Sequence, residues 1–243
     1  MAPVEFGAKD FWEANAVEPE YAEWLTHSYT ELAPMVHNCC SETAAVLHIG
    51  CGISTLSQSM HDDGYCHQLA IDFSEMCMQQ QQILSRGRPT LANATMDCTR
   101  LALRDSSIDV CIDKSTADAL LCNDDGEGAV SEMALEVRRI LRHNGLWLIV
   151  SLNEPDAIVP ALKAAVHDER TAILIACQAL FSGRNLLYVY SCKVLKELDS
   201  SSTALATAPA EVEHKRLEHG WMRAVHGMSA GPLRGALLRW SAR

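Results

Sequence analysis

Residues 48–57 read His48-Ile49-Gly50-Cys51-Gly52-Ile53-Ser54-Thr55-Leu56-Ser57, and this stretch decides the fold of the 243-residue chain. The apolar run that leads into it, Ala44–Ile49, predicts a β-strand, and the glycines predict a tight turn into a helix over Ser54–His61. Glycines at such a turn let a ligand approach the main chain, and the amides of the following helix point at it. The stretch therefore predicts a nucleotide-type site above a sheet, although a tight turn without a ligand has the same pattern.

On either side of this stretch, short apolar runs alternate with longer helical patterns from residue 44 to about 150, which is typical of a parallel sheet covered by helices. Strands are predicted at Ala44–Ile49, His67–Ile71, Leu91–Thr95, Ile108–Ile112 and Leu146–Ser151. Helices are predicted at Ser54–His61, Ser74–Leu84, Ser115–Leu121 and Val130–Arg142, the last closed by a left-handed cap at Asn144–Gly145.

Two further strands, Ala172–Ala179 and Leu186–Val194, are predicted at the end of this region. The turn between them has no room for a helix, so the pair must be antiparallel. We therefore predict an α/β fold with a Rossmann-like, seven-stranded, mostly parallel sheet that ends in an antiparallel hairpin. This hairpin distinguishes the fold from the ordinary dinucleotide-binding sheet.

The chain divides into three predicted parts. Residues 1–40 form a helical lid, built from segments at Phe11–Trp12 and Tyr21–Pro34, that folds over the site. Residues 41–195 form the main domain. Residues 196–243 form an extension in which Asp199–Pro209, rich in Ser, Thr and Ala, is a flexible linker and Glu211–Arg243 contains a short docking helix.

The composition restricts the classes of function. No apolar run is long enough to span a bilayer and the start of the chain lacks a secretory pattern, so we expect a cytoplasmic protein that does not enter a membrane. The ten cysteines are scattered, which predicts free thiols and no metal site. A net charge of −11 disfavours nucleic acid as a partner and suits a basic protein substrate.

Two acidic residues at strand ends narrow the choice of ligand. Asp72 lies 22 residues after Gly50, where a carboxylate accepts hydrogen bonds from both hydroxyls of a ribose, and where it would also suit a helix cap. Asp97 can accept from an adenine amino group while the Cys98 amide addresses the ring. NAD and S-adenosylmethionine both carry these groups. Thr55 replaces the last glycine of the dinucleotide fingerprint G-x-G-x-x-G, which disfavours a pyrophosphate cofactor.

Together with the glycine stretch, four later segments match the pattern of a known family in both their order and their spacing. They are Ile71-Asp72-Phe73-Ser74, Met96-Asp97, Asp113-Lys114-Ser115-Thr116-Ala117-Asp118-Ala119-Leu120-Leu121 and Glu136-Val137-Arg138-Arg139-Ile140-Leu141. Over roughly residues 10–195 the chain resembles the methyltransferase-like family that includes elongation factor 1A lysine methyltransferases. The resemblance implies the class I methyltransferase fold, S-adenosylmethionine as cofactor and a protein lysine as acceptor, with a basic translation factor as one candidate substrate.

The resemblance also implies the cofactor-binding residues. They are Trp12, Trp24, Gly50, Gly52, Asp72, Phe73, Asp97, Cys98 and Lys114. The two tryptophans belong to pairs, Phe11-Trp12 and Glu23-Trp24, whose aromatic faces would attract a sulfonium cation. The chain departs from the family pattern at three places: Asn15-Ala16 replaces Arg-Tyr, Ile53 replaces Asn and Ser115 replaces Gly.

Asp113, at the end of the fourth predicted strand, is the candidate catalytic residue. A lysine acceptor must lose its proton before it attacks, and a dry pocket with a nearby carboxylate would favour and orient the neutral amine. Asp113 would also suit an ion pair with Lys114 or a cap on the following helix. Nucleic-acid amino methyltransferases usually carry Asn or Asp followed by Pro-Pro-aromatic here, and this chain does not.

Two other readings stay open. The departures at Asn15-Ala16 and Ile53 suit a protein that binds the cofactor or a partner without catalysis. The glycines and Asp72 suit an NAD-dependent oxidoreductase, although the chain lacks the completed fingerprint and a Tyr-x-x-x-Lys pair for hydride chemistry.

Overall fold

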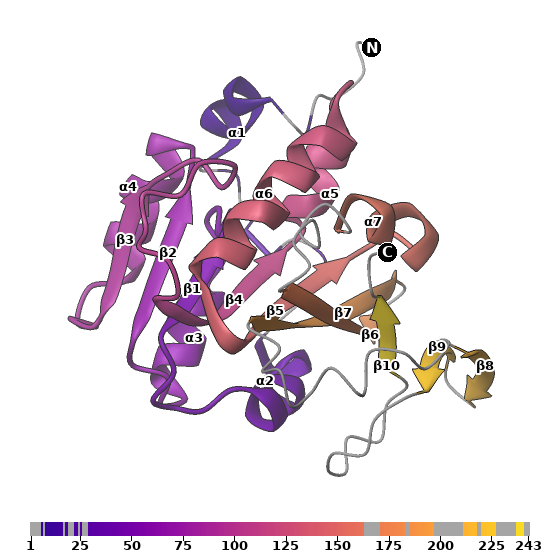
Figure 1. Ribbon diagram of the computed structural model, residues 1–243. Helices are drawn as coiled ribbons and strands as arrows, with labels where there is room; N and C mark the ends of the chain where they lie inside the picture. Colours follow the sequence, from indigo (N-terminus) through magenta and orange to yellow (C-terminus); the bar gives the residue numbers. More distant parts are fainter. Residues whose placement is uncertain are drawn as a thin grey trace.

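The computed structural model describes residues 6, 8–16, 18, 22–23, 25, 29–162, 171–182 and 185–196, together with the backbone of 211–217, 220–226 and 237–240 (Figure 1). A mixed eight-stranded sheet runs through the centre in the order β10-β6-β7-β5-β4-β1-β2-β3. Its strands are β1 Val46–Ile49, β2 Gln68–Asp72, β3 Leu91–Thr95, β4 Ile108–Lys114, β5 Leu141–Ser151, β6 Thr171–Ser182, β7 Asn185–Lys196 and β10 Leu237–Trp240. All seven predicted strands are present, and the predicted fold class is confirmed.

The pairing of these strands agrees with the predicted topology. β1 pairs in parallel with β2 and with β4, β2 pairs in parallel with β3, and β4 pairs in parallel with β5. β7 lies antiparallel between β5 and β6, so the expected hairpin closes this side of the sheet. Because the chain leaves β1 toward β3 and later returns to β4 on the other side of β1, a crevice opens above the carboxyl ends of β1 and β4, where ligands bind in such sheets.

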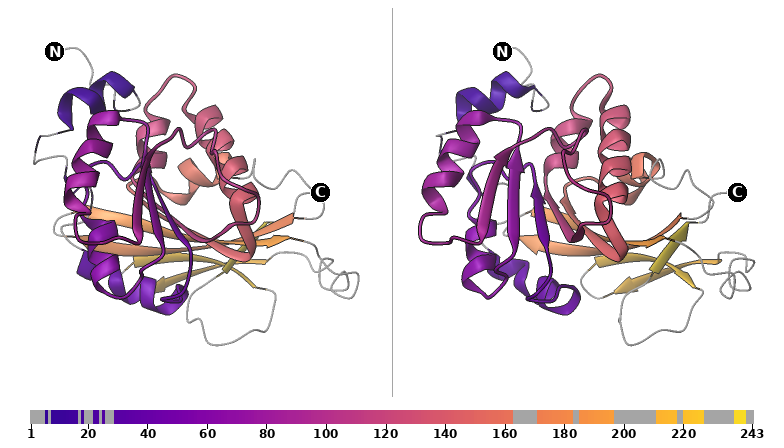
Figure 2. Two further views of the ribbon diagram at one scale, coloured as in Figure 1. Left: turned by 90° about the vertical axis from the view of Figure 1, so that its left-hand side faces the viewer. Right: turned by 60° about the vertical axis from the view of Figure 1, so that its left-hand side comes forward.

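Helices cover both faces of the sheet (Figure 2). They are α1 Lys9–Asn15, the 3-10 helix η2 Tyr29–Glu31, α2 Ala33–Cys39, α3 Leu56–Asp62, α4 Glu75–Leu84, α5 Thr116–Leu121, α6 Gly126–Ile140 and α7 Pro155–Leu162. One apolar cluster packs the sheet against α5, α6 and α7, and the second packs it against η2, α2 and α3. In β4, Cys111 belongs to the first cluster while Val110 and Ile112 belong to the second, as the two-residue period of a strand requires.

The end of α6 differs from the prediction. The helix stops at Ile140 and the chain enters β5 directly, so Asn144 does not cap the helix, although its φ of +63° is left-handed as expected. Ile108 pairs with Leu141 and Val110 already pairs with Leu146, so β5 carries extra residues at this point. Asn144 therefore lies in a bulge of the strand, where a left-handed residue is also common.

Three predictions outside the sheet need correction or remain open. Ala22, Glu23 and Leu25 lie in turns and bends, so the second lid helix does not cover Tyr21–Pro34, and helical structure begins at Tyr29. The docking helix predicted in Glu211–Arg243 is wrong for the described part of that stretch, where β8 Glu211–Leu217 and β9 Gly220–His226 form a hairpin and β10 pairs with β6. The predicted linker Asp199–Pro209 lies outside the described residues. Helix α7 was not predicted.

Candidate functional site

The glycine loop between β1 and α3 forms one wall of the site. Gly50 and Gly52 have φ values of +56° and +52°, a region that side chains with a Cβ rarely adopt. A Cβ on Gly50 would lie 2.2 Å from the Thr116 hydroxyl oxygen. That hydroxyl donates a hydrogen bond of 2.9 Å to the Ile49 carbonyl, and the Cys51 amide donates one of 2.9 Å to the Ile71 carbonyl. The loop is therefore fixed from α5 and from β2.

Asp72 is held at the end of β2 by backbone amides. Its Oδ2 accepts from the Gly52 amide at 2.9 Å, and its Oδ1 accepts from the Ser74 amide at 2.9 Å. Burial raises the pKa of this carboxyl, which is only 6% exposed. Each carboxylate oxygen has a second lone pair, so both can still accept a hydrogen bond from a ligand hydroxyl. Asp72 holds the amide of Ser74, which is the residue that caps α4, and its contact with a ribose stays a prediction.

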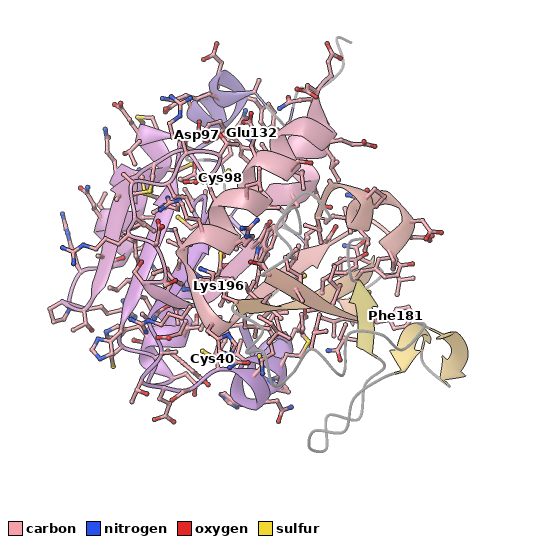
Figure 3. The ribbon with its side chains drawn as sticks, in the orientation of Figure 1. Cys40, Asp97, Cys98, Glu132, Phe181 and Lys196 are labelled. Carbon is pink, nitrogen blue, oxygen red and sulfur yellow. The ribbon has the colours of Figure 1, made fainter. Side chains whose placement is uncertain are left out.

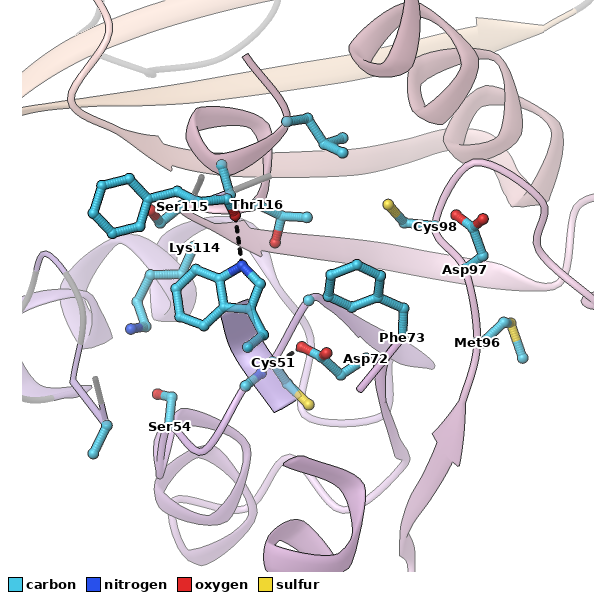
Figure 4. Close-up of a pocket in the computed structure, with 17 residues that line it drawn as sticks. Cys51, Ser54, Asp72, Phe73, Met96, Asp97, Cys98, Lys114, Ser115 and Thr116 are labelled. Carbon is cyan, nitrogen blue, oxygen red and sulfur yellow. Dashed lines mark hydrogen bonds between the residues drawn. The ribbon is translucent and has the colours of Figure 1, made fainter. Parts of the chain in front are cut away.

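A pocket of about 800 Å³, counting its open mouth, lies above the carboxyl ends of β1 to β4 (Figure 4). Ser54 and Lys114 lie at one end of the pocket, Asp72 and Phe73 in the middle, and Asp97 and Cys98 at the other end. The pocket is lined by Phe6, Trp12, Ala22, Gly50, Cys51, Gly52, Ser54, Asp72, Phe73, Met96, Asp97, Cys98, Lys114, Ser115, Thr116, Ala119 and Leu120.

Most of the predicted cofactor-binding residues therefore meet in this pocket. Eight of them line it: Trp12, Gly50, Gly52, Asp72, Phe73, Asp97, Cys98 and Lys114. Asp97 and Cys98 follow β3 and lie at the carboxyl edge of the parallel strands, far from Cys40 at the other end of the molecule (Figure 3). The ninth, Trp24, lies outside the described residues.

Asp113 lies beside the pocket rather than in its lining. Its side chain is fully buried, and its oxygens accept from the Thr116 amide at 2.7 Å and from the Ala117 amide at 3.2 Å. Burial raises the pKa of Asp113 to about 7, with a smaller contribution from the nearby Asp118 charge. These are the contacts of a helix cap, the alternative role considered for this residue. A direct contact with the nucleophile stays a prediction.

Lys114 and Glu23 close the end of the pocket near the glycine loop. The Lys114 Nζ lies 3.7 Å from the Glu23 Oε2, and burial lowers the pKa of the lysine. Glu23 Oε1 accepts from the Thr55 amide at 2.8 Å and from its hydroxyl at 2.6 Å, while Oε2 accepts from the Ser54 hydroxyl at 3.0 Å. The N-terminal segment is thereby attached to the first turn of α3.

Helix α1, which like Glu23 belongs to the N-terminal segment, also borders the pocket. Trp12 donates a hydrogen bond of 2.6 Å from Nε1 to the Phe6 carbonyl, and both residues line the pocket. Glu13 accepts from the Glu75 amide at 2.9 Å and from the Met76 amide at 3.2 Å, at the start of α4. Two carboxylates of the N-terminal segment, Glu13 and Glu23, therefore bind the first turns of the two helices that border the glycine loop.

Several site residues were missed from the sequence. Phe6 and Ala22 come from the N-terminal segment, and Ala119 and Leu120 from α5. The segment that contains Ala119 and Leu120 matched the family pattern, which could have identified them as lining residues. The segment around Phe6 has no periodic pattern, so its place over the pocket depends on tertiary contacts alone.

Other features bear on the class of site. All ten cysteines lie among the described residues and are free thiols, as predicted. In the part of the chain that the structure describes, no cluster of three His, Cys, Asp or Glu side chains is arranged to hold a metal ion. Within those same ranges, no helix is both long and apolar enough to cross a membrane.

Comparison with known proteins shows what the chain is similar to. A methyltransferase domain family matches residues 47–149. The eEF1A lysine and N-terminal methyltransferase of Bos taurus is 31% identical over 188 residues, which are 75% of this chain and 26% of that protein. Its counterpart from Homo sapiens is 33% identical over 163 residues, 65% of this chain and 23% of that protein. The chain spans about a quarter of the length of these curated relatives.

The fold is likewise that of solved methyltransferases. The structure of Burkholderia thailandensis 1,6-didemethyltoxoflavin-N1-methyltransferase, determined with S-adenosylhomocysteine bound, superposes with a TM-score of 0.63 at 13% identity, covering 81% of this chain and 92% of that chain. At this identity the likeness concerns the fold alone. The matched domain family and the curated relatives bear out the resemblance carried by the glycine stretch and the four later segments. Residues 47–149 of this chain thus match a methyltransferase domain family.

Proposed function

We propose that the chain is an S-adenosylmethionine-dependent methyltransferase that acts on a lysine of a protein. The observation that carries this proposal is the order of groups along the pocket, from Lys114 through Asp72 to Asp97. In this order, the glycine loop beside Lys114 would bind the amino-acid part of the cofactor, Asp72 the ribose hydroxyls and Asp97 the adenine base. The matched domain family and the named activity of the curated relatives support the same conclusion.

The residues present fit this cofactor. The left-handed Gly50 and Gly52 leave the loop without side chains where the ligand would approach it. Asp72 would accept from the ribose hydroxyls with its remaining lone pairs, and Asp97 would accept from the adenine amino group. The Trp12 and Phe73 rings line the same pocket, and aromatic faces attract a sulfonium cation. When bound, the cofactor supplies an electrophilic methyl group.

The chain's own residues would mainly position the reactants and exclude water, because transfer from a sulfonium needs little covalent assistance. Phe6, Trp12 and Leu120 give the pocket an apolar lining. Such surroundings lower the pKa of an incoming lysine and so favour the neutral amine that can attack. Asp113 would act by holding the amide of Thr116 at the start of α5. The hydroxyl of Thr116 in turn donates to the Ile49 carbonyl.

A basic protein is the proposed partner. The net charge of −11 favours approach of a positively charged surface, and the curated relatives are named for eEF1A. A translation factor is therefore our first candidate substrate. The ten free thiols support a reducing compartment, and we propose the cytoplasm.

The test is a transfer assay with a mapped product. The purified chain is incubated with methyl-labelled S-adenosylmethionine and a eukaryotic cell extract, and labelled peptides are sequenced by mass spectrometry. We expect label on lysine side chains of one or a few basic proteins, and none with Asp72→Ala. Asp62→Ala, which removes an exposed carboxylate paired with Arg88, is the matched control and should transfer normally. Cofactor binding without label on any protein would instead support the non-catalytic alternative, and label confined to N-terminal amines would contradict the lysine assignment.

A further inference from the structure

Gln81 of α4 is fully buried directly beneath the glycine loop. Its Nε2 donates hydrogen bonds to the Gly52 carbonyl at 3.0 Å and to the Ser54 carbonyl at 2.8 Å. Both protons of the amide group are thus used on the main chain of the loop. Gln81 does not line the pocket, so these bonds have no direct role in ligand contact.

The orientation of the Gln81 amide is fixed by its neighbours. Its Oε1 accepts from the Gln58 Nε2 at 2.7 Å, and Gln58 also donates to the Ser85 hydroxyl at 3.1 Å. Asn93 on β3 donates to the same hydroxyl at 3.0 Å. A flipped Gln81 would place its oxygen against two carbonyl oxygens and its nitrogen against a donor. The buried network therefore selects one orientation.

The peptide groups of Gly52 are held from two sides as a result. The amide of Gly52 donates to Asp72, and its carbonyl accepts from Gln81. A glycine with a φ of +52° has a wide choice of other conformations, so these two bonds determine which one the loop adopts. The same Gly52 amide holds one oxygen of Asp72, which links Gln81 to the proposed ribose ligand.

We infer that Gln81 is a positioning residue for the cofactor. It keeps the glycine loop in its binding conformation before the ligand arrives, so that the loop does not have to be ordered during binding. This inference rests on the proposed function, because it takes S-adenosylmethionine as the ligand of the pocket. Gln81 acts through Gly52 and Asp72 and does not touch the reacting atoms.

The test compares Gln81→Met with a matched variant, Gln68→Met. Gln68 is also buried, and its Nε2 also donates to two main-chain carbonyls, those of Ser57 at 3.0 Å and Tyr65 at 2.6 Å, away from the loop. Both variants should lower the Tm, because each removes three buried hydrogen bonds: the two to main-chain carbonyls and one at Oε1, which joins Gln81 to Gln58 and Gln68 to His48. Only Gln81→Met should weaken the binding of S-adenosylhomocysteine, measured by calorimetry. We expect a loss of affinity of about tenfold, because roughly one more backbone residue must be ordered on binding.

A second measurement follows the loop without any ligand. Amide hydrogen exchange at Gly52 should become faster in Gln81→Met and stay as in the wild type in Gln68→Met. Equal affinity and equal Gly52 exchange in Gln81→Met and the wild type would overturn the inference, as would an equal loss of affinity in the two variants. A wild-type chain that binds no S-adenosylhomocysteine would contradict the proposed function instead.

A milder variant covers the case in which Gln81→Met does not fold. Gln58→Met removes the donor that orients the Gln81 amide but leaves both loop bonds available. We expect a smaller loss of affinity and a smaller rise in Gly52 exchange, both in the same direction. Wild-type values for both measurements in Gln58→Met would also contradict the role assigned to Gln81.

Discussion

Single residues decide whether the glycine loop can form. Gly50 and Gly52 were recognised from the sequence because only residues without a Cβ suit a tight turn that a ligand approaches. The sequence could not show that they differ, because the difference lies in a contact between segments distant in the chain. A Cβ on Gly50 would meet Thr116 of α5, whereas nothing lies within 4 Å of a Cβ on Gly52.

This difference predicts unequal effects of two alanine substitutions. Gly52→Ala should cost about 1 kcal/mol of unfolding free energy, the strain of a left-handed residue with a Cβ. Gly50→Ala should cost about 2–4 kcal/mol, because the same strain is joined by a collision with the Thr116 side chain. Urea unfolding monitored by circular dichroism measures both. Equal losses in the two variants would contradict the contact between the loop and α5.

Asp113 predicts a pH dependence of stability. Its pKa of about 7 in the folded chain exceeds the ordinary value of 3.8, so the native state holds a proton that the unfolded state has lost. The stability due to this group is complete below pH 3.8 and is lost as the pH rises toward and through 7. The free energy of unfolding lost in this way is at most about 4 kcal/mol, since each unit of pKa difference between the folded and unfolded states is worth about 1.36 kcal/mol.

Asp113→Asn should remove this dependence. The asparagine keeps one oxygen for the Thr116 amide but cannot ionise. The Tm of the variant minus that of the wild type should therefore increase from pH 5 to pH 8 in thermal scans. A difference that stays constant over this range would show that Asp113 does not titrate as its burial indicates. Methyl transfer retained by the variant would favour the helix-cap role over contact with the nucleophile.

Among the elements, the strands of the sheet were the most predictable. Each buried strand is a short apolar run between turn residues, and that signal is local. The elements that depend on distant partners were not predictable. β10 is a strand because it pairs with β6, which lies far away in the sequence. The spaced apolar residues around β10 suit a helix as well as a strand, so the local pattern could not decide between them. Gln81 lies in a run of four glutamines that suggests an exposed face, yet it is buried under the loop.

The helices that border the glycine loop depend on carboxylates from the N-terminal segment. The first amides of a helix have no partner within it, and Glu23 supplies one for α3 as Glu13 does for α4. The first part of the predicted lid is thus attached by helix capping, whereas its η2 and α2 part packs on the sheet through the second apolar cluster. Nothing in the local sequence around Glu23 indicates this, since the partner is set by the fold.

Removing this cap should release the N-terminal segment. Glu23→Ala should accelerate trypsin cleavage after Lys9 and lower stability by about 1 kcal/mol, the usual cost of a lost cap. The cleavage is followed by mass spectrometry of timed samples. Glu18→Ala changes an exposed carboxylate of the same segment and should leave the rate unchanged. Equal cleavage rates in Glu23→Ala and the wild type would contradict the attachment through α3.

At the scale of the whole molecule, topology and site reinforce each other. The order of strands opens a crevice above the carboxyl ends of the paired strands β1 and β4. The glycine loop, Asp72 and Asp97 all lie at its edge because parallel strands end on the same side. The strand ends were predictable from local patterns, whereas the arrangement of the strands in the sheet was expected only through the resemblance to the class I methyltransferase fold. The loop alone is compatible with NAD and with S-adenosylmethionine. The hairpin of β6 and β7 and the matched family favour S-adenosylmethionine.

The central claim, that this pocket holds S-adenosylmethionine, is tested most directly by calorimetric titration of S-adenosylmethionine and of NAD into the purified chain. We predict binding of one S-adenosylmethionine to each chain and no heat of binding with NAD. Asp72→Ala should weaken the binding by about 100-fold, the loss of two charge-assisted hydrogen bonds to the ligand. The variant should also have a lower Tm, because the Gly52 and Ser74 amides lose their acceptor, but it should still unfold cooperatively. Binding of NAD in place of S-adenosylmethionine, or unchanged affinity in Asp72→Ala, would contradict this account.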